Sequence, residues 1–395
     1  MKKSFVMISM AICTLMLLSA CAPKTVATAP ATTAPATTAP ATTAPATTAP
    51  VVTTEPPVAA GSCLIIGATY GGYINDAGYN QAMHEAVMAI KTNIPCVQII
   101  EAENVYDEAG ATSTMLNMIS QGAKMIIATG FSHQSAAFVL AQTHPDVIFE
   151  HAGGWLQRAN FGTFFGSPPD GWYLMGIAAG KMTTSNKIGF VANAPFGWAL
   201  TFINAFELGV QSVNPDAQTY VTFTQTWGDS AREAEATNAL INQGADVISM
   251  FVDSPVTVIG TAESRGVYSI GFQNLAAQQF APEFWISGTY YTLGPTLTRL
   301  TQEVINHTWG DEKSVTCGIT AGCMGIAPFG PHVPQEVQTL VTTKLAEIDA
   351  GTLVVFKGPI VDQNGNVVIA EGEVLTPDKM SGVDWFVKGV VGSPK

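Results

Sequence analysis

The sequence predicts an α/β protein with two lobes, each built on a doubly wound parallel sheet. Short, continuous apolar runs alternate with helix-length segments, as expected for strands that helices cover on both faces. A second set of alternating apolar runs and helix-length segments begins near Ile188. The phrase Gln-Gly-Ala occurs at matching points of both halves, residues 121–123 and 243–245, where a helix ends and a buried strand follows. A common helix–strand joint would also explain the phrase, but its matched spacing favours two similarly wound lobes.

The apolar pattern places the elements in order, because strands are shorter and more uniformly apolar than helices. In the first lobe we expect strands at residues 63–67, 96–100, 125–128 and 147–150, and helices at 81–92, 111–121 and 172–182. In the second lobe we expect strands at residues 188–191, 218–223, 247–250 and 268–270, and helices at 200–210, 231–243 and 256–265. A late strand is expected near Ile286.

The N-terminus has the parts of a bacterial export signal. Lys2 and Lys3 supply positive charge, and residues 5–18 form an apolar run too short to count on as a membrane-spanning helix of about 20 residues. The run ends in Leu-Ser-Ala-Cys at residues 18–21, which resembles the lipobox of bacterial lipoproteins. We therefore expect residues 1–20 to be a signal peptide and Cys21 to be lipidated. The alternative is an ordinary secretory signal followed by an incidental cysteine.

Residues 21–61 are predicted to be a linker between the lipid and the folded part. Residues 27–50 repeat Ala-Thr-Thr-Ala-Pro. The regular prolines prevent helix formation, and no residue here could build a core. We expect a semi-extended, proline-rich spacer.

Composition and charge limit the possible partners. The 395-residue chain is 47% hydrophobic and only 12% charged, and without signal and linker it keeps roughly 335 residues, enough for two lobes. The formal net charge of -13 argues against nucleic acid binding. No second apolar stretch approaches membrane-spanning length, so we expect attachment to the cell membrane through the lipid alone. We expect the folded part to lie outside the cytoplasm and the protein to be a monomer.

Four cysteines remain in the mature chain: Cys63, Cys96, Cys317 and Cys323. Outside the cell an even number suggests disulfides, and four cysteines allow three pairings. Cys63 and Cys96 open two strands that should be neighbours, and Cys317 and Cys323 would close a short loop. Four buried free thiols are the alternative. The spacing of cysteine and histidine does not suggest a zinc site.

Aromatic and polar residues gather in the loops that should follow the strands. Ligands of open parallel sheets bind at the carboxyl ends of the strands. Aromatic faces can stack on a flat ring, and Asp, Asn or Gln can bond its polar edge. A single aromatic residue would be local packing, but one in nearly every such loop predicts a stacking site. The candidates are Asp76, Tyr79, Asn80, Phe131, Phe196, Trp198, Trp227, Asp253, Gln273 and Tyr290.

Several short motifs occur in a characteristic order. They are residues 75–80 (Asn-Asp-Ala-Gly-Tyr-Asn) with His84 and Glu85 one turn into the next helix, residues 176–183 (Gly-Ile-Ala-Ala-Gly-Lys-Met-Thr), residues 253–255 (Asp-Ser-Pro), residues 266–271 (Gly-Val-Tyr-Ser-Ile-Gly), and a tail from residues 356–360 (Phe-Lys-Gly-Pro-Ile) to residues 384–386 (Asp-Trp-Phe). With these motifs the chain, from about residue 63 to residue 392, resembles the basic membrane protein family of substrate-binding lipoproteins, also called the purine-nucleoside-receptor-like family.

The resemblance implies a type I periplasmic-binding fold in which a three-strand hinge joins the lobes. Residues 62–185 and 286–325 would form the first lobe, and residues 186–285 and 326–395 the second. The ligand would be a purine base or nucleoside held between the lobes. The protein partners would be the permease and ATPase of an ATP-binding-cassette (ABC) importer.

The resemblance also assigns roles to residues of this chain. Tyr79 would stack on the base, Asp76 and Asn80 would contact its polar groups, and Asp253 would lie in the contact loop of the second lobe. Gln273 departs from the family, in which an acid at about this position would grip ribose hydroxyls. An amide favours a free base or another small aromatic solute, such as a flavin-like one.

Two other classes of function stay open at this point. An enzyme would need a nucleophile and a base in a fixed relation, and neither Gly-x-Ser-x-Gly nor His-Glu-x-x-His occurs. We expect no catalytic site, no metal site and no cofactor, and we expect His84 to be a hydrogen-bonding residue on the side of a helix. A surface sensor or adhesin with the same fold but no transporter is the other class.

Overall fold

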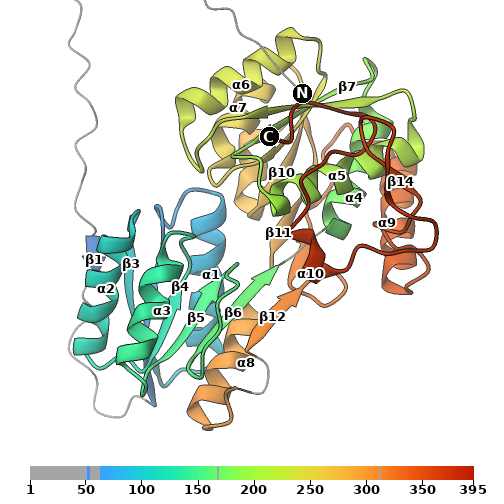
Figure 1. Ribbon diagram of the computed structural model, residues 1–395. Coiled ribbons are helices and arrows are strands. Elements are labelled where there is room, and N and C mark those ends of the chain that lie inside the picture. Colours follow the sequence, from blue (N-terminus) through green and yellow to red (C-terminus); the bar gives the residue numbers. More distant parts are fainter. Residues whose placement is uncertain (1–50, 54–62, 167–168, 311–312) are drawn as a thin grey trace, which may run out of the picture. The chain divides into compact units, whose positions relative to one another are not determined.

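The structure is a computed structural model that describes residues 51–53, 63–166, 169–310 and 313–395 (Figure 1). The predicted signal peptide, the lipidation site at Cys21 and the Ala-Thr-Thr-Ala-Pro repeat lie outside the described residues. The described chain is an α/β protein with two seven-stranded, mainly parallel sheets. This architecture is the predicted fold class.

The first sheet carries two helices on each face. One face is covered by α1 (Tyr79–Asn93) and α8 (Gly294–Ile305), and the other by α2 (Glu108–Ser120) and α3 (His133–Thr143). All neighbouring strands are parallel except β1, which runs antiparallel to β3. The strand order is β1 (Val51–Thr53), β3 (Val97–Glu103), β2 (Leu64–Thr69), β4 (Met125–Ala128), β5 (Ile148–Ala152), β6 (Phe161–Gly166) and β12 (Ser314–Cys317).

Strand β4 shows why these strands are continuous apolar runs in the sequence. All four of its residues are buried. Met125 and Ile127 join the core cluster on the α1 side, whereas Ile126 and Ala128 join the cluster on the α2 and α3 side. Neighbouring side chains of a strand point to opposite faces, so a strand covered on both faces needs apolar residues throughout.

The second sheet is built in the same way. One face is covered by α4 (Pro169–Met182) and α5 (Gly197–Val213), and the other by α6 (Ser230–Asn242) and α7 (Pro255–Ser264). The strand order is β13 (Met324–Ile326), β11 (Trp285–Tyr291), β10 (Tyr268–Gln273), β9 (Val247–Phe251), β7 (Lys187–Ala192), β8 (Gln218–Phe223) and β16 (Val390–Val391). Further elements are η1 (Leu275–Phe280), α9 (Gln335–Asp349), the β14 (Ile360–Val361) and β15 (Val367–Ile369) hairpin and α10 (Pro377–Met380).

The matching Gln-Gly-Ala phrases end α2 and α6. Gly122 and Gly244 have φ angles of 96° and 97°, in the left-handed region that glycine adopts without strain. Each glycine leads into a buried strand, β4 in the first lobe and β9 in the second. The two lobes therefore share this joint, as their sequences indicate.

Helix α4 packs on the second lobe, so the predicted lobe boundary at residue 185 lies one helix too late. The contact is between α4 and α5, where Gly176 and Gly209 let the two backbones approach closely. A Cβ on Gly176 would collide with the carbonyl oxygen of Phe206, and a Cβ on Gly209 with that of Tyr173. The apolar sequence of α4 shows that it is buried but does not show which sheet buries it.

Strand β11 also differs from the predicted boundaries, which placed residues from 286 onward in the first lobe. It pairs in parallel with β10, so it is part of the second sheet. The chain returns to the first lobe only at α8, which packs on α1. In the described chain the crossings between lobes lie between β6 and α4, between β11 and α8, and between β12 and β13.

Among the described residues there are two disulfides, in the expected pairing. Cys63–Cys96 joins the residues just before β2 and β3, with Cα atoms 5.4 Å apart. Cys317–Cys323 joins the end of β12 to the residue before β13, with Cα atoms 5.6 Å apart, and so lies within a crossing. The backbone N–H of Thr292, in the β11–α8 crossing, donates to the Cys323 carbonyl at 2.8 Å. The second disulfide loop is thus part of the β12–β13 crossing and is hydrogen-bonded to the β11–α8 crossing.

Several described elements were not predicted, among them β1, β6, β12, α3, α8 and α9. Strand β1 falls within the predicted linker, at a Val-Val-Thr run whose β-branched residues favour strands. Helix α3 has Ser132, a favoured residue, at its N-cap, but the side chain makes no cap hydrogen bond. Strand β6 contains two glycines in Phe-Gly-Thr-Phe-Phe-Gly, and glycine is depleted in strands.

Candidate functional site

The candidate site begins at the turn that leads into α1. The carboxylate of Asp76 accepts hydrogen bonds from the backbone N–H groups of Gly78, Asn80 and Gln81, at 2.8, 3.1 and 3.0 Å. It also accepts one from Asn80 Nδ2 at 2.8 Å, while Asn80 Oδ1 accepts from the backbone N–H of Gly72 at 2.9 Å. Burial raises the pKa of Asp76, against the opposing effect of these hydrogen bonds. Both side chains therefore hold the loop and the start of α1, which is a different task from the predicted contact with a ligand.

Tyr79 is the first residue of α1 and faces the second lobe. Its hydroxyl donates to the carbonyl of Thr129 at 2.8 Å. Its ring meets the ring of Tyr291 edge-on, with 6.1 Å between centroids. Burial, and then the nearby Asp253 carboxyl, raise the pKa of the Tyr79 phenol, which stays a neutral hydrogen-bond donor.

Aromatic rings from both lobes form a continuous series. Phe131 follows β4 of the first lobe and is 52% exposed. Its ring centroid lies 5.9 Å from that of Trp227, which follows β8 of the second lobe. Trp227 in turn lies 5.7 Å from Phe196 and 5.9 Å from Phe251. On the other side of Phe131, the ring of Trp155 lies at 5.9 Å. The lobes therefore meet ring against ring at the ends of their strands.

Asp253 and Gln273 form the polar part of the site in the second lobe. Asp253 follows β9, and Gln273 ends β10, the neighbouring strand. Gln273 Nε2 donates to Asp253 Oδ1 at 3.3 Å. Burial, and then the charge of Asp76, raise the pKa of Asp253 to about 8, while the bond from Gln273 lowers it. Asp253 therefore changes charge near neutral pH.

Two hydrogen bonds join the lobes directly. The backbone N–H of Tyr79 donates to the carbonyl of Asp253 at 3.2 Å. Asn274 Nδ2 donates to Glu85 Oε2 at 3.0 Å. Gly78 lies against the same Asp253 carbonyl, where a Cβ would collide with it. The start of α1 is thus in close contact with the loop after β9.

Two of the predicted site residues take no part in the contacts between lobes described above. Tyr290 packs against the core cluster beneath α6 and α7, and its ring lies over Gly325. Its neighbour Tyr291 is the residue that reaches Tyr79, because successive side chains of a strand point to opposite faces. Trp198 lies in the first turn of α5, with its ring 6.1 Å from that of Phe202.

Trp155 and Phe251 contact these rings but are absent from the predicted candidates, and of the adjacent pair Tyr290 and Tyr291 the candidates include Tyr290. Phe251 is the last residue of β9 and was counted with the buried strand. Trp155 follows β5, a strand end that the predicted loops did not include, and it is 66% exposed. The available signal was an aromatic residue at or shortly after the carboxyl end of a strand, because Tyr291 is the last residue of β11 and Trp155 lies three residues after β5.

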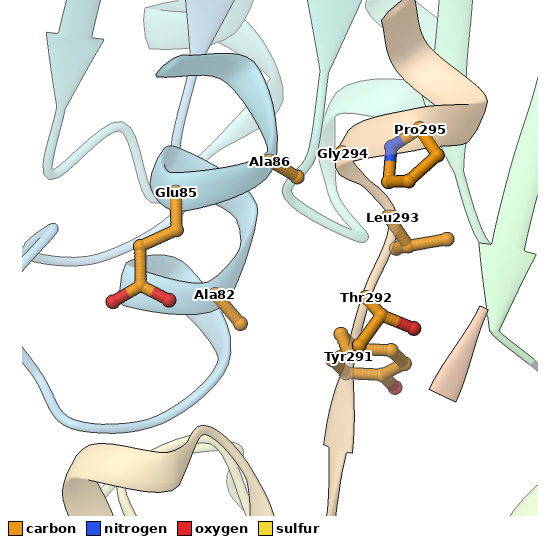
Figure 2. A pocket seen from close by; sticks show the side chains of 8 residues that line it. All are labelled: Ala82, Glu85, Ala86, Tyr291, Thr292, Leu293, Gly294 and Pro295. Atoms are coloured by element: carbon orange, nitrogen blue, oxygen red, sulfur yellow. The ribbon is translucent and has the colours of Figure 1, made fainter. Parts of the chain in front are cut away.

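A small pocket lies beside the site, between α1 and the segment that joins β11 to α8 (Figure 2). Glu85, whose carboxylate accepts the bond from Asn274, is on its α1 side, and Tyr291 is on its β11 side. The pocket therefore borders one of the crossings between lobes. Its lining residues are Ala82, Glu85, Ala86, Tyr291, Thr292, Leu293, Gly294 and Pro295.

His84 and His133 both make hydrogen bonds within the first lobe. His84 Nδ1 lies 2.8 Å from Glu101 Oε1, and this bond, against some desolvation, raises the pKa of His84. His133 is buried between Thr69 Oγ1 at 3.1 Å and the Val105 carbonyl at 2.7 Å, and burial lowers its pKa. In the described ranges, His, Cys, Asp and Glu do not cluster in a way that could hold a metal ion. Nor does any described helix have the length and apolar character needed to cross a membrane.

Comparison with known proteins adds to this geometry. Residues 64–353 match the family described as ABC transporter substrate-binding protein PnrA-like. A purine-binding protein of Brucella abortus is 31% identical over 331 residues, which cover 83% of this chain and 93% of that protein. A protein of Haloferax volcanii, provisionally named an ABC transporter glucose-binding protein, is 32% identical over 333 residues, which cover 82% of this chain and 79% of that protein.

Solved structures agree on the fold. An ABC transporter solute-binding protein from Conexibacter woesei superposes with a TM-score of 0.62 at 20% identity, covering 73% of this chain and 97% of that one. The match confirms the type I periplasmic-binding fold. Taken with the family match over most of the folded part, it leads to one conclusion: the chain belongs to the PnrA-like family of ABC transporter substrate-binding proteins.

Proposed function

We propose that this protein captures a purine base or nucleoside between its two lobes and presents it to the permease of an ABC importer. The observation that carries the proposal is the junction of the lobes, where Phe131 and Trp227 from opposite lobes meet beside the Asp253–Gln273 pair. Flat rings suit stacking on aromatic faces, and the polar pair suits the edge of a heterocycle. The 31% identity to a purine-binding protein supports the same ligand class.

The proposed mechanism is closure of the lobes on the ligand. A ring stacked against both Phe131 and Trp227 would contact both lobes only when they are together, so binding would favour the closed state. The direct bonds between lobes, from Tyr79 to Asp253 and from Asn274 to Glu85, would stabilise that state further. The permease could then distinguish loaded from empty protein by its conformation.

Within this class, Gln273 favours a free base over a nucleoside. Its amide is bonded to Asp253 and is neutral. Two hydroxyls of a ribose are held better by an ionised acid, which forms stronger hydrogen bonds than a neutral amide. We therefore expect bases to bind more tightly than the corresponding nucleosides.

Thermal unfolding and tryptophan fluorescence test the proposal. Adenine, guanine or a related nucleoside should raise the melting temperature, because a ligand that binds only the folded state stabilises it. The same ligands should quench fluorescence through Trp227. Amino acids should do neither. Binding of an amino acid, with none of any purine, would overturn the proposal.

Glucose is the second candidate ligand, because a relative that is 32% identical is provisionally named for glucose binding. Aromatic faces also suit the apolar faces of sugars. Titration with glucose in the same assays separates the two candidates. A melting temperature that rises with glucose and is unaffected by purines would favour the sugar.

We further propose that the protein is a lipoprotein held at the outer side of the cell membrane through Cys21. Substrate-binding proteins of this family act outside the cytoplasm, which agrees with export. The lipobox-like Leu-Ser-Ala-Cys and the proline-rich segment after it support a tethered rather than a freely diffusing protein. A permease and an ATPase encoded beside this gene would support import over a role as a surface sensor.

Cys21→Ala tests the anchor. The variant should be released or retained as an unprocessed precursor, because the thiol that accepts the lipid is lost. Labelling cells with palmitate checks this, with Cys13→Ala as the control that keeps Cys21. Unchanged palmitate incorporation in Cys21→Ala would contradict lipidation at this residue.

A further inference from the structure

Three neighbouring strands of the second lobe end in hydrogen-bond acceptors. The strand order places β10, β9 and β7 side by side. Gln273 ends β10, Asp253 follows β9, and Asn193 follows β7. Gln273 Oε1 and Asn193 Oδ1 are buried and have no hydrogen-bond partner in the described chain. Buried polar atoms of this kind are normally satisfied, so these acceptors suit a ligand that brings donors.

Gln273 is held in an orientation that leaves its oxygen free. Its Nε2 donates to Asp253 Oδ1 at 3.3 Å, and when Asp253 is ionised only the nitrogen of the amide can donate to it. Its side chain is 98% buried, with 2% exposure. Its φ angle of 80° lies in the left-handed region, which a non-glycine residue adopts at a cost. Backbone strain of this kind is concentrated at binding sites.

Asp253 lies in acidic surroundings. The ionisable groups that face it are Asp76 before α1, Glu233 on α6, and the phenols of Tyr79 on α1 and Tyr291 on β11. Asp76 and Glu233 repel a negative charge on Asp253, and Gln273 donates to it. A ligand with hydrogen-bond donors would therefore stabilise the negative charge of Asp253, whereas an anionic ligand would add to the repulsion.

We propose, resting on the purine-binding function above, that the preferred ligand presents two adjacent N–H donors, as guanine does with N1–H and its 2-amino group. The Asp253 carboxylate and Gln273 Oε1 would accept these donors. Adenine presents an amino donor beside the N1 lone pair, so one of its ring nitrogens would face an acceptor. Hypoxanthine keeps N1–H and lacks the 2-amino group. All three are flat purines of similar stacking area, so they differ mainly in this edge.

Calorimetric titration of the full chain with guanine, hypoxanthine and adenine at pH 7.5 tests the proposal. We expect guanine to bind most tightly, hypoxanthine about tenfold more weakly because one buried acceptor stays unpaired, and adenine more weakly still. Equal or tighter binding of adenine would overturn the guanine-type edge and leave the purine function intact. Failure of every purine to bind would overturn both.

The pH dependence gives an independent readout. Guanine would bind the ionised Asp253, and because burial raises the pKa of the free carboxyl to about 8, binding would release a proton. Its affinity should therefore rise between pH 6 and pH 8. A ligand with adenine's edge would bind the protonated carboxyl and show the opposite trend. Proton release, measured by calorimetry in two buffers of different ionisation heat, separates the two cases.

Two substitutions locate the effect. Gln273→Met removes the free acceptor and keeps the length of the side chain. It should bring the ratio of the affinities for guanine and hypoxanthine close to one. Asp253→Asn replaces one acceptor by a donor. It should lower the affinity for guanine at least about tenfold more than the affinity for adenine. Gln338→Met on α9 is the matched control and should change neither. An unchanged guanine preference in Gln273→Met would contradict the assigned acceptor.

Discussion

Trp227 is one of the residues at which rings from both lobes meet. It contacts Phe131 of the first lobe and Phe196 and Phe251 of the second. Trp198 is a partly buried tryptophan of the same lobe, but its ring contacts Phe202 within α5 instead. The two tryptophans therefore allow a comparison between a ring at the junction of the lobes and a ring packed within the second lobe.

Trp227→Ala should weaken purine binding by about tenfold to a hundredfold, by analogy with the 1–3 kcal/mol of base stacking on an aromatic ring. Trp198→Ala should change affinity much less. Calorimetry of both variants, with melting temperatures to confirm folding, makes the comparison. Equal losses in the two variants would mean that stacking on Trp227 does not hold the ligand.

Single residues show where prediction from sequence stops. A loop rich in aromatic residues predicts a stacking site, but the choice between Tyr290 and Tyr291 depends on which face of β11 each one points to, and a one-residue shift reverses it. Asp76 and Asn80 lie in the segment Asn-Asp-Ala-Gly-Tyr-Asn, one of the motifs on which the predicted ligand contacts rest, yet their side chains bond mainly to the backbone around the start of α1. A motif in the sequence does not separate residues that hold a loop from residues that face a ligand.

The start of α1 is in direct contact with the other lobe. The backbone N–H of Tyr79 bonds to the Asp253 carbonyl, and Gly78 leaves room for that contact. A side chain at Gly78 would collide with the Asp253 carbonyl and lie 2.5 Å from Pro255 Cδ. The closed arrangement therefore depends on a glycine here.

Gly78→Ala should shift the protein toward an open arrangement of its lobes and weaken ligand binding about tenfold or more, since closure would need backbone displacement. The lobes themselves should stay folded. Small-angle scattering with saturating ligand measures closure, and calorimetry measures affinity. Gly260→Ala on α7, where a Cβ meets no atom within 4 Å, is the control. Full closure and wild-type affinity in Gly78→Ala would contradict this account.

At the scale of elements, the sequence predicted most strands and helices but not how all of them group. Alternating apolar runs revealed the strands because helices cover both faces of each sheet. The grouping of α4 depends on the close contact of Gly176 and Gly209 with α5, which involves residues far apart in the chain. No local pattern contains that information.

The whole molecule contains buried acids whose protonation couples to folding. Burial raises the pKa of Glu150 and Glu207 to about 8, and that of Glu233 to about 7. Glu207 is held by Thr219 Oγ1 at 2.6 Å and Gln211 Nε2 at 2.9 Å. In the unfolded chain these acids return to the ordinary value of 4.5, so folding takes up protons between about pH 4.5 and pH 8.

The free energy of unfolding should therefore be larger at pH 5 than at pH 8. The contribution of each raised acid is complete below its unfolded pKa and is lost as the pH rises to its folded pKa, by up to about 1.4 kcal/mol per unit of pKa difference. Melting temperatures across this range check the trend. Glu207→Gln, which mimics the protonated acid, should flatten it. A melting temperature that increases from pH 5 to pH 8 would contradict the raised pKa values.

The central claim is that the junction between lobes binds a purine. Calorimetric titration of the purified protein with guanine, adenine and glucose under one set of conditions tests it most directly. The account predicts saturable binding of a purine with one site per chain, negligible heat from glucose, and loss of the purine signal in Trp227→Ala. Saturable binding of glucose with no binding of either purine would contradict it.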